Sequence, residues 1–426
     1  MKLNYKFRLY PSGVEVSRLE GTLEVCRGVY NTALTQRRWA WRQGRRSMSY
    51  RQQAAELTEA KASYPELGQV HSQVLQDVLR RLDKSFYNFF RRVASGEKPG
   101  YPRYKGRNRY NSFTYPQSGF SFTRNGKKLK LSKIGSVRIR RHRPFPDGAA
   151  VKNCTIKREG ERWYAIFSLE IPHKTSKEDG EKAPVNFKPT SPVGVDAGLA
   201  HLVALSTGEC VEAPKFFRKA EAKVIKEQRR LSRRKKGSNN RDKQRKRVAR
   251  AHRKVADQRR DFLHKLSRWL VDEHGLIVLE DLRIKNMVRN RRLSKSITDA
   301  AWGTLANMLS YKAEEAGGLV LKVPPYDTSQ ACSGCGAQVP KDLSARVHSC
   351  PGCGIALDRD VNAAVNILAL GLKKLGLKTA GQDLPEPGGP HGEARNACGD
   401  LASIPPPTLV GVGGVSRIVE TGSSVL

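Results

Sequence analysis

Alternation of apolar and polar residues marks the first element of the chain. Across residues 2–10 every second side chain is apolar, and Pro11 follows, so the segment is predicted to be a strand with one buried face. Its apolar positions are Leu3, Tyr5, Phe7 and Leu9. The apolar spacing then changes to three and four residues, which predicts a helix around residues 19–34 and a partner helix over about residues 70–93.

Turn signals separate the next strands. Asn125-Gly126 precedes a strand pattern at residues 127–131, and Glu159-Gly160 lies between patterns at residues 155–158 and 163–170. Short strands joined by tight turns are typical of antiparallel sheets. Together with the first strand they predict a small antiparallel barrel, interrupted by a helical insertion.

The second half of the chain reads as α/β, after a polar, Pro-containing linker between Pro172 and Pro192. Strands are predicted at residues 193–196, 202–205, 276–279 and 319–323. The basic region around residues 215–270 is predicted to form two antiparallel helices with a break near residues 237–240. Further helices are predicted near residues 305–315 and after residue 360. The final stretch is rich in Pro, Gly and Ser and has little periodicity, so it is expected to be disordered.

The charge of the chain indicates a binding partner. The chain of 426 residues has 78 Lys+Arg against 40 Asp+Glu, a net charge of +38, which favours a nucleic-acid partner over a membrane surface or a merely basic protein. No run of 18 apolar residues and no signal peptide occur in the sequence. We therefore expect a soluble, intracellular protein.

Several groups of side chains are candidates for contacting nucleic acid, although the helix face is more ordinarily a solvated face and the aromatic and basic segment could be an exposed basic loop. Amides on a helix face flanked by arginine can contact adenine edges, and basic residues interleaved with aromatic ones can bind phosphate and stack on bases. Gln53 could extend the first of these surfaces. The candidates are Tyr50, Ser72, Gln73, Gln76, Arg80, Arg103, Tyr104, Lys105, Arg233, Arg234, Lys235, Lys236, Arg291 and Arg292.

Two Cys-x-x-Cys pairs predict a metal site. Cys332 and Cys335 are followed, after a gap of fourteen residues, by Cys350 and Cys353, and a glycine follows each pair. Four thiolates close a tetrahedral sphere, so a structural zinc ion (Zn2+) is favoured over redox chemistry. His348 could compete as a ligand, but packing or exposure is the simpler expectation.

Three acidic residues stand at the ends of predicted elements. Asp196 and Glu280 each close an apolar strand, and Asp360 opens an apolar helix. Each alone is an ordinary strand-end or cap residue, yet strand ends can converge, and a carboxylate cluster would bind magnesium (Mg2+), with two ions suited to phosphodiester cleavage. Asp281 and Asp358 are less suitable because their side chains should point the other way.

A series of motifs carries a family resemblance. In order along the chain they are Gly194-Val195-Asp196-Ala197-Gly198, Leu231-Ser232-Arg233-Arg234-Lys235-Lys236-Gly237-Ser238, Asp261-Phe262-Leu263-His264-Lys265-Leu266-Ser267, Leu279-Glu280-Asp281-Leu282, Ser296-Ile297-Thr298-Asp299-Ala300-Ala301-Trp302-Gly303, Thr328-Ser329-Gln330, both cysteine pairs, and Asp358-Arg359-Asp360-Val361-Asn362-Ala363-Ala364-Val365-Asn366-Ile367. By these motifs the chain resembles TnpB, the transposon-encoded RNA-guided DNA endonuclease related to the type V CRISPR effectors.

The resemblance implies a multi-domain α/β plus β-barrel fold. It has a small N-terminal barrel with an inserted helical recognition domain, and an RNase H-like (RuvC) nuclease domain with an inserted zinc knuckle. The expected parts are a wedge-like barrel (1–12 and 100–175), a recognition domain (13–99), a linker (176–192), a nuclease domain (193–325 and 356–378), a zinc-binding insertion (326–355) and a disordered tail (379–426).

The resemblance also implies roles and partners. Asp196, Glu280 and Asp360 would be catalytic and hold magnesium, and the surface of Tyr50 with residues 72–76 would read a short motif beside the target. Guide RNA and double-stranded DNA would be the partners of a monomer in the cytoplasm of a prokaryotic cell, associated with the nucleoid when on DNA. The expected function is RNA-guided, magnesium-dependent DNA cleavage. A guided repressor without cleavage and an unguided RuvC-type nuclease or transposase remain open as alternatives.

Overall fold

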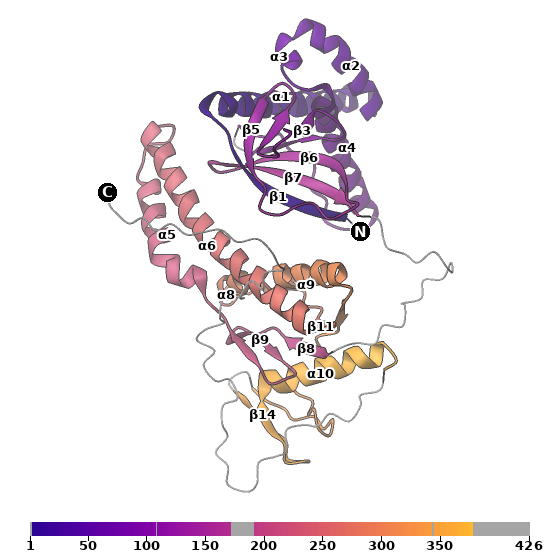
Figure 1. Cartoon of the computed structure of the whole chain (residues 1–426), viewed down its shortest axis with the longest axis vertical. Coiled ribbons are helices and arrows are strands. Elements are labelled where there is room, and N and C mark those ends of the chain that lie inside the picture. Colours follow the sequence, from indigo (N-terminus) through magenta and orange to yellow (C-terminus); the bar gives the residue numbers. More distant parts are fainter. Residues whose placement is uncertain (1, 108, 172–190, 343–344, 378–426) are drawn as a thin grey trace. The chain divides into compact units, whose positions relative to one another are not determined.

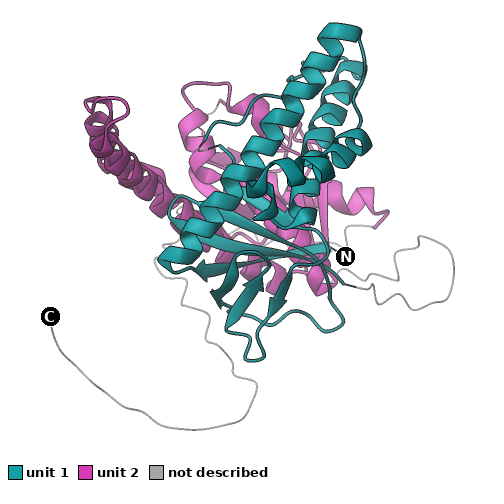
Figure 2. Ribbon diagram, turned by 90° about the horizontal axis from the view of Figure 1, so that it is seen from above, with its two compact units in different colours: residues 1–181 teal, residues 182–426 magenta. Residues whose placement is uncertain are grey.

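The computed structural model describes residues 2–107, 109–171, 191–342 and 345–377. The chain divides into two compact units, residues 1–181 and residues 182–426 (Figure 2). Most of the predicted linker and the whole predicted tail lie outside the described residues. None of the helices in the described ranges is long and apolar enough to cross a membrane.

Unit 1 contains an antiparallel sheet of seven strands in the order β2-β6-β7-β1-β5-β4-β3 (Figure 1). The strands are β1 (Lys2–Tyr10), β2 (Ser112–Tyr115), β3 (Phe120–Phe122), β4 (Lys128–Leu131), β5 (Gly135–Arg140), β6 (Ala150–Glu159) and β7 (Arg162–Glu170). The predicted turns are present, because Gly126 and Gly160 both have positive φ between paired strands.

The sheet curls toward a barrel. Strands β2 and β3 form its two edges, yet only residues 116–119 connect them. A flat sheet of seven strands would separate its edges by about 29 Å, whereas five extended residue steps span at most about 18 Å. The rings of Tyr115 and Phe120, one on each edge strand, lie 6.4 Å apart. The predicted small barrel is therefore confirmed in the coarser form of a near-barrel sheet.

The helices of unit 1 lie between β1 and β2 in the sequence. They are α1 (Gly13–Gly44), α2 (Tyr50–Ser63), α3 (Pro65–Gly68) and α4 (Ser72–Ala94). A capping box of Ser12 and Glu15 begins α1, and one of Ser49 and Gln52 begins α2. The buried stripes of α1 and α4 share one core with the inner face of the sheet.

Unit 2 is built on a mixed sheet with the order β10-β9-β8-β11-β12. The strands are β8 (Pro192–Asp196), β9 (His201–Leu205), β10 (Cys210–Glu212), β11 (Leu276–Glu280) and β12 (Leu319–Val323). The strands β8, β11 and β12 run parallel, while β9 and β10 continue the sheet antiparallel from β8.

Helices cover both faces of this sheet (Figure 1). Alternate β11 residues explain why the strand is apolar throughout. Ile277 and Leu279 pack into the core with α6 (Asn239–Glu273) and α9 (Trp302–Ala316), and Leu276 and Val278 pack against α10 (Arg359–Lys374). The other elements are α5 (Phe216–Ser232), α7 (Ile284–Met287), α8 (Ser294–Ala300), β13 (Val347–Ser349) and β14 (Ala356–Asp358).

Candidate functional site

The first two predicted acidic residues stand side by side at one edge of the sheet in unit 2. Strands β8 and β11 pair in parallel, with Leu279 opposite Val195. The next residue on each strand is Glu280 or Asp196, the last residue of its strand. In sheets of this kind, ligands bind outside the carboxyl ends of the parallel strands.

Helix α10 brings Asp360 to the same edge because two glycines let it approach the strands closely. A Cβ atom on Gly194 of β8 would lie 2.0 Å from the carbonyl oxygen of Ala364, and one on Gly371 of α10 would lie 2.5 Å from Val278 of β11. Asp360 lies in the first turn of α10, and its Oδ2 is 3.6 Å from the position of a Cβ on Gly198, two residues beyond Asp196. The structure thus brings the three acidic residues together.

The carboxylates affect one another electrostatically. Burial, and then the negative charges of Glu280 and Asp360, raise the pKa of Asp196 to about 7, against the Ala197 amide and Arg359, which lower it. Burial also raises the pKa of Glu280, although a hydrogen bond from Thr328 opposes the shift. Asp360 is buried and lies 3.3 Å from the guanidinium of Arg359. Glu280 and Asp360 therefore oppose ionisation of Asp196.

The neighbouring acidic residues have other roles. Asp358 caps α10, because its carboxylate accepts hydrogen bonds from the amides of Asp360 (2.8 Å) and Val361 (3.3 Å). Asp281 has a side chain that is 68% exposed and lies 3.5 Å from Lys322. Since Asp358 serves as the cap, the carboxylate of Asp360 is not needed for capping.

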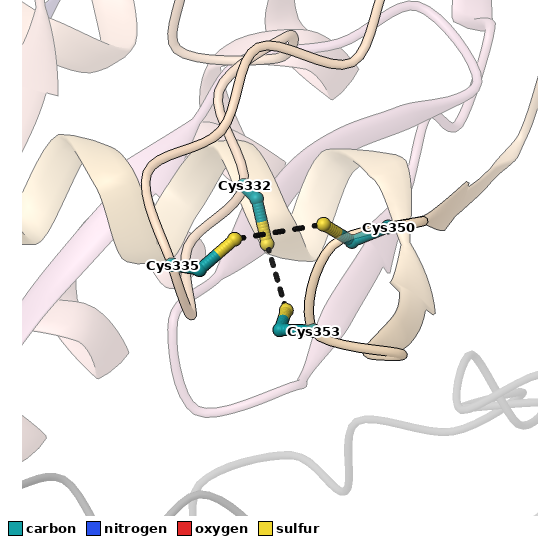
Figure 3. Close-up of side chains that lie close together, drawn as sticks. All are labelled: Cys332, Cys335, Cys350 and Cys353. Atoms are coloured by element: carbon teal, nitrogen blue, oxygen red, sulfur yellow. Dashed lines mark hydrogen bonds between the residues drawn. The ribbon is translucent and has the colours of Figure 1, made fainter.

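The four cysteines of the paired motifs converge from two loops of the insertion between β12 and α10 (Figure 3). Their sulfur atoms lie within 4.8 Å of one another, with Cys332–Cys353 and Cys335–Cys350 each at 3.6 Å. Tetrahedral zinc–thiolate bonds would place the sulfurs about 3.8 Å apart. In the described part of the chain, no other group of metal-binding side chains is so tight, so the carboxylate cluster is looser.

The two cysteine loops repeat one backbone pattern. The amide of Gly336 donates to Cys332 O and that of Gly354 to Cys350 O, each at 2.9 Å, and both glycines have positive φ. Backbone amides, that of Cys353 first, lower the pKa of the Cys350 thiol to about 6. His348 is buried and hydrogen-bonded with Lys341, outside the four-sulfur group.

One surface of unit 1 gathers several of the predicted nucleic-acid contacts. Arg80 lies over the ring of Tyr50 and donates to its hydroxyl at 3.3 Å. Ser72 accepts a hydrogen bond from Lys61, Gln73 accepts one from Ser118, and Gln76 is partly exposed nearby on α4. The predicted contribution of Gln53 to this surface is wrong.

Gln53 is buried because α2 packs that face against α1. Its side chain is 3% exposed and donates to the carbonyl oxygen of Ala33 at 2.8 Å, while its own oxygen accepts from Arg37. Gln53 therefore satisfies buried polar groups between two helices and cannot reach a groove of DNA.

The predicted basic and aromatic loop runs along α1. Tyr104 shares a hydrogen bond with Thr35 at 3.2 Å, the backbone of Lys105 is held by Asn31, and the Lys105 ammonium lies over the ring of Tyr30. Arg103 is exposed. Part of this loop is therefore occupied in packing, with Arg103 left to solvent.

The basic residues predicted in unit 2 lie in exposed connections. Arg233, Arg234, Lys235 and Lys236 are all exposed between α5 and α6, and Arg291 and Arg292 are exposed between α7 and α8. The turn between α5 and α6 is closed by Arg241, which donates to the carbonyl oxygens of Leu231 and Arg234.

Sequence reasoning missed a basic groove between the two long helices, although it predicted both helices and their charge. The groove has a volume of about 560 Å³ and an apolar floor that includes Val224 and Val255. Its basic side chains are Lys219, Lys223, Arg247, Arg250 and Lys254. Helical spacing of these residues along two antiparallel helices was the signal that could have revealed it.

Family models match three parts of the chain. Residues 170–291 match a probable transposase of the OrfB_IS605 type, and residues 302–367 match a Cas12f1-like TNB domain. Residues 1–46 match a model described as a helix-turn-helix domain, although the structure has strand β1 and the single helix α1 over residues 2–44.

Two relatives extend these matches along the chain. A protein of Streptomyces pristinaespiralis named "Putative RNA-guided DNA endonuclease" is 40% identical over 342 residues, covering 79% of this chain and 81% of the relative. The Escherichia coli K12 protein named "Putative RNA-guided DNA endonuclease InsQ" is 35% identical over 349 residues, covering 78% and 83%.

A cryo-EM structure of a Cas12f1-sgRNA-target DNA complex matches the fold with a TM-score of 0.52 at 14% identity, covering 83% of this chain and 82% of that one. The two relatives confirm the motif resemblance over more than three quarters of the chain. The chain belongs to the TnpB family of RNA-guided DNA endonucleases.

Proposed function

We propose that this protein is a magnesium-dependent, RNA-guided DNA endonuclease in which pairing with a guide RNA selects the target and unit 2 cuts it. The observation that carries the catalytic part is the convergence of Asp196, Glu280 and Asp360 at the carboxyl edge of the β8–β11 pair. The guided part is supported by two relatives with that name, each aligned over more than three quarters of the chain.

The carboxylate cluster fits magnesium by its chemistry. Hard divalent cations prefer carboxylate oxygens, and a buried group of like charges is relieved when a cation binds. Asp196, Glu280 and Asp360 would hold the metal, and two ions are favoured for cutting a phosphodiester. When bound, magnesium activates water and stabilises the leaving oxygen.

The chain's own residues prepare this site. The positive N-terminal end of α10 favours an ionised Asp360, and Thr328 orients Glu280 through a hydrogen bond of 2.7 Å. The close contact of α10 with β8 at Gly194 holds Asp360 near the strand ends. These contacts support an RNase H-like (RuvC) assignment for unit 2.

The four-thiol cluster fits a structural zinc ion. Four cysteines leave no open position for a substrate, so the metal would stabilise the insertion rather than react. The tetrahedral match of the sulfur distances supports zinc in this role.

Nucleic acid would contact both units. In unit 1, the surface formed by Tyr50, Arg80 and the start of α4 is our candidate reader of a short motif beside the target. In unit 2, the groove between α5 and α6 and the exposed turn at residues 233–236 would bind phosphate backbone.

A reconstituted cleavage assay tests the proposal. The protein is purified with RNA transcribed from its own flanking locus and offered a plasmid library randomised beside a guide-matched target. We expect cleavage that needs magnesium. It should vanish with Glu280→Gln and survive in the matched control Asp281→Asn.

The alternatives give different results in the same assay. Guided binding without cleavage would assign the protein as a repressor, and the complete acidic cluster argues against that outcome. Cleavage without RNA would assign an unguided nuclease.

A further inference from the structure

The insertion that carries the four cysteines is fastened to α10 by two asparagines. Asn362 is fully buried, donates to the carbonyl oxygen of Ala331 at 2.9 Å and accepts from the amide of Ser333 at 3.0 Å. One turn later, Asn366 donates to the carbonyl oxygens of Ala331 and Thr328, both at 2.8 Å. The backbone from Thr328 to Ser333, which includes Cys332, is therefore fixed on the helix that carries Asp360.

Thr328 continues this connection into the carboxylate cluster. The residue is 6% exposed, and its hydroxyl donates to Oε1 of Glu280 at 2.7 Å. The same residue is held at its carbonyl oxygen by Asn366. One side of Thr328 is thus anchored to α10, while the other orients a carboxylate at the end of β11.

We infer that Thr328 is a positioning residue for metal binding, which acts through Glu280 and is itself held in place by Asn366. The inference rests on the proposed function, because Glu280 is there a magnesium ligand. A glutamate side chain has three rotatable bonds, and a hydrogen bond to Oε1 fixes its orientation and leaves Oε2 free to bind the cation.

The geometry also links the two metal groups of unit 2. The segment 328–333 includes Cys332 of the first cysteine loop, and it is hydrogen-bonded to Asn362 and Asn366 of α10 and to Glu280 of β11. Displacement of this segment would release the Glu280 carboxylate. The cysteine insertion thereby helps to orient Glu280, the proposed metal ligand, in addition to stabilising its own loops.

Two substitutions separate positioning from packing. Thr328→Val keeps the shape of the side chain and removes the hydroxyl, whereas Thr328→Ser keeps the hydroxyl and removes a methyl group. Thr328→Ala removes the hydroxyl without adding bulk, and serves if the valine variant does not fold. A packing role predicts that the serine variant is impaired, and a positioning role predicts that it is not.

Binding of Mn2+ to the protein–guide RNA complex, measured by electron paramagnetic resonance, gives a readout that does not depend on cleavage. Thr328→Val and Thr328→Ala should weaken Mn2+ binding and raise the half-saturating magnesium concentration for cleavage by about 10- to 100-fold, as for other residues that orient metal ligands. Thr328→Ser should stay within about threefold of wild type, and the zinc content of all variants should be unchanged.

Asn366→Ala provides a second test of the same connection. It should weaken Mn2+ binding in the wild-type background, and have much less effect when Thr328 is already valine, because the two residues act in series. Additive effects of the two substitutions would overturn the role of Asn366.

The outcomes distinguish this inference from the proposed function. The inference alone would be overturned if Thr328→Val bound Mn2+ as tightly as the wild type. It would also be overturned if Thr328→Ser bound Mn2+ as weakly as Thr328→Val. Wild-type protein that binds no Mn2+ and cuts no DNA would overturn both.

Discussion

The two candidate metal sites of unit 2 are built in opposite ways. The four cysteines come from one short stretch of chain, and their loops repeat one backbone pattern. The three carboxylates come from β8, β11 and α10, which are separated by much of the chain and meet only when the sheet and its helix assemble. One group can close around a metal locally, while the other depends on the whole unit.

The energetic consequences differ as well. Thiolates around zinc contribute directly to folding, because the metal crosslinks a segment with little core of its own. Buried carboxylates without a cation oppose folding, as the raised pKa of Asp196 indicates. We therefore expect the cysteine group to govern the stability of its segment and the carboxylate group to govern activity.

The largest effect is expected from Asp196→Asn. Removal of a ligand should lower cleavage by about 1000-fold or more. Stability without magnesium should not fall, because the substitution removes like-charge repulsion. Cleavage rates and melting temperatures measured on the same samples check both parts, and loss of stability in parallel with activity would contradict the comparison.

The same substitution has a pH signature. The folded pKa of Asp196 is raised above its unfolded value, so this group makes the magnesium-free protein less stable as pH rises from about 4 to about 7. Above about pH 7 the stability no longer changes with pH through this group, because Asp196 is then ionised in both the folded and the unfolded protein. The asparagine variant should lack this part of the pH dependence in thermal melts without magnesium.

Cys335→Ser tests the other group. It should release zinc and expose the insertion, seen as lost zinc by elemental analysis and faster hydrogen exchange over residues 326–342 and 345–358. Cleavage should also fall, because Thr328 is then released from its position beside Glu280. Cys26→Ala is the matched control, since Cys26 is a buried cysteine in unit 1 outside the cluster, and it should keep the zinc.

An acidic residue outside these two groups, Asp299, shows what a carboxylate with a paired counter-charge contributes. Asp299 accepts from the amide of Phe217, in the first turn of α5, and pairs with Arg259 of α6, so it joins α8 to both long helices. Its side chain is 7% exposed. Asp299 lies in one of the motifs that carry the family resemblance, and its role is visible only in the fold.

Asp299→Asn should destabilise unit 2 by about 3 kcal/mol, because it leaves the guanidinium of Arg259, whose side chain is only 21% exposed, without its counter-charge. Asp272→Asn is the control, since Asp272 pairs with Arg268 at an exposed position and should cost less than about 1 kcal/mol. Urea denaturation of both variants measures the difference, and equal losses would contradict the role of Asp299.

The difference between the groups also explains what the sequence could reveal. Cysteine spacing is local, so the ligands could be named directly, whereas the strand-end carboxylates could be named only as candidates. Their convergence depends on the parallel pairing of β8 with β11 and on the contact at Gly194, which no local pattern encodes.

Tertiary packing accounts for the errors at finer scale. Gln53 reads as a surface residue beside Tyr50, but packing of α2 on α1 buries it. The hydroxyl of Thr328 could not be assigned to Glu280 because the two residues are 48 positions apart in the sequence and only the fold brings them together. Strands and helices with strong periodicity, such as β1, α4 and α6, were predicted because each pattern is continuous within its element.

The smallest effect is expected at the exposed turn between α5 and α6. Combined replacement of Arg234, Lys235 and Lys236 by alanine should weaken nucleic-acid binding by about tenfold. The slope of log K against log salt concentration should become shallower by up to about 0.9 for each phosphate that the turn no longer neutralises. Stability should not change, since these side chains are exposed. Filter binding or fluorescence titration at several salt concentrations measures both quantities, with Arg268→Ala as the control because Arg268 is engaged by Asp272. An unchanged salt slope would show that this turn does not bind phosphate. The groove between α5 and α6 would then be the candidate site in unit 2 for binding the nucleic-acid backbone.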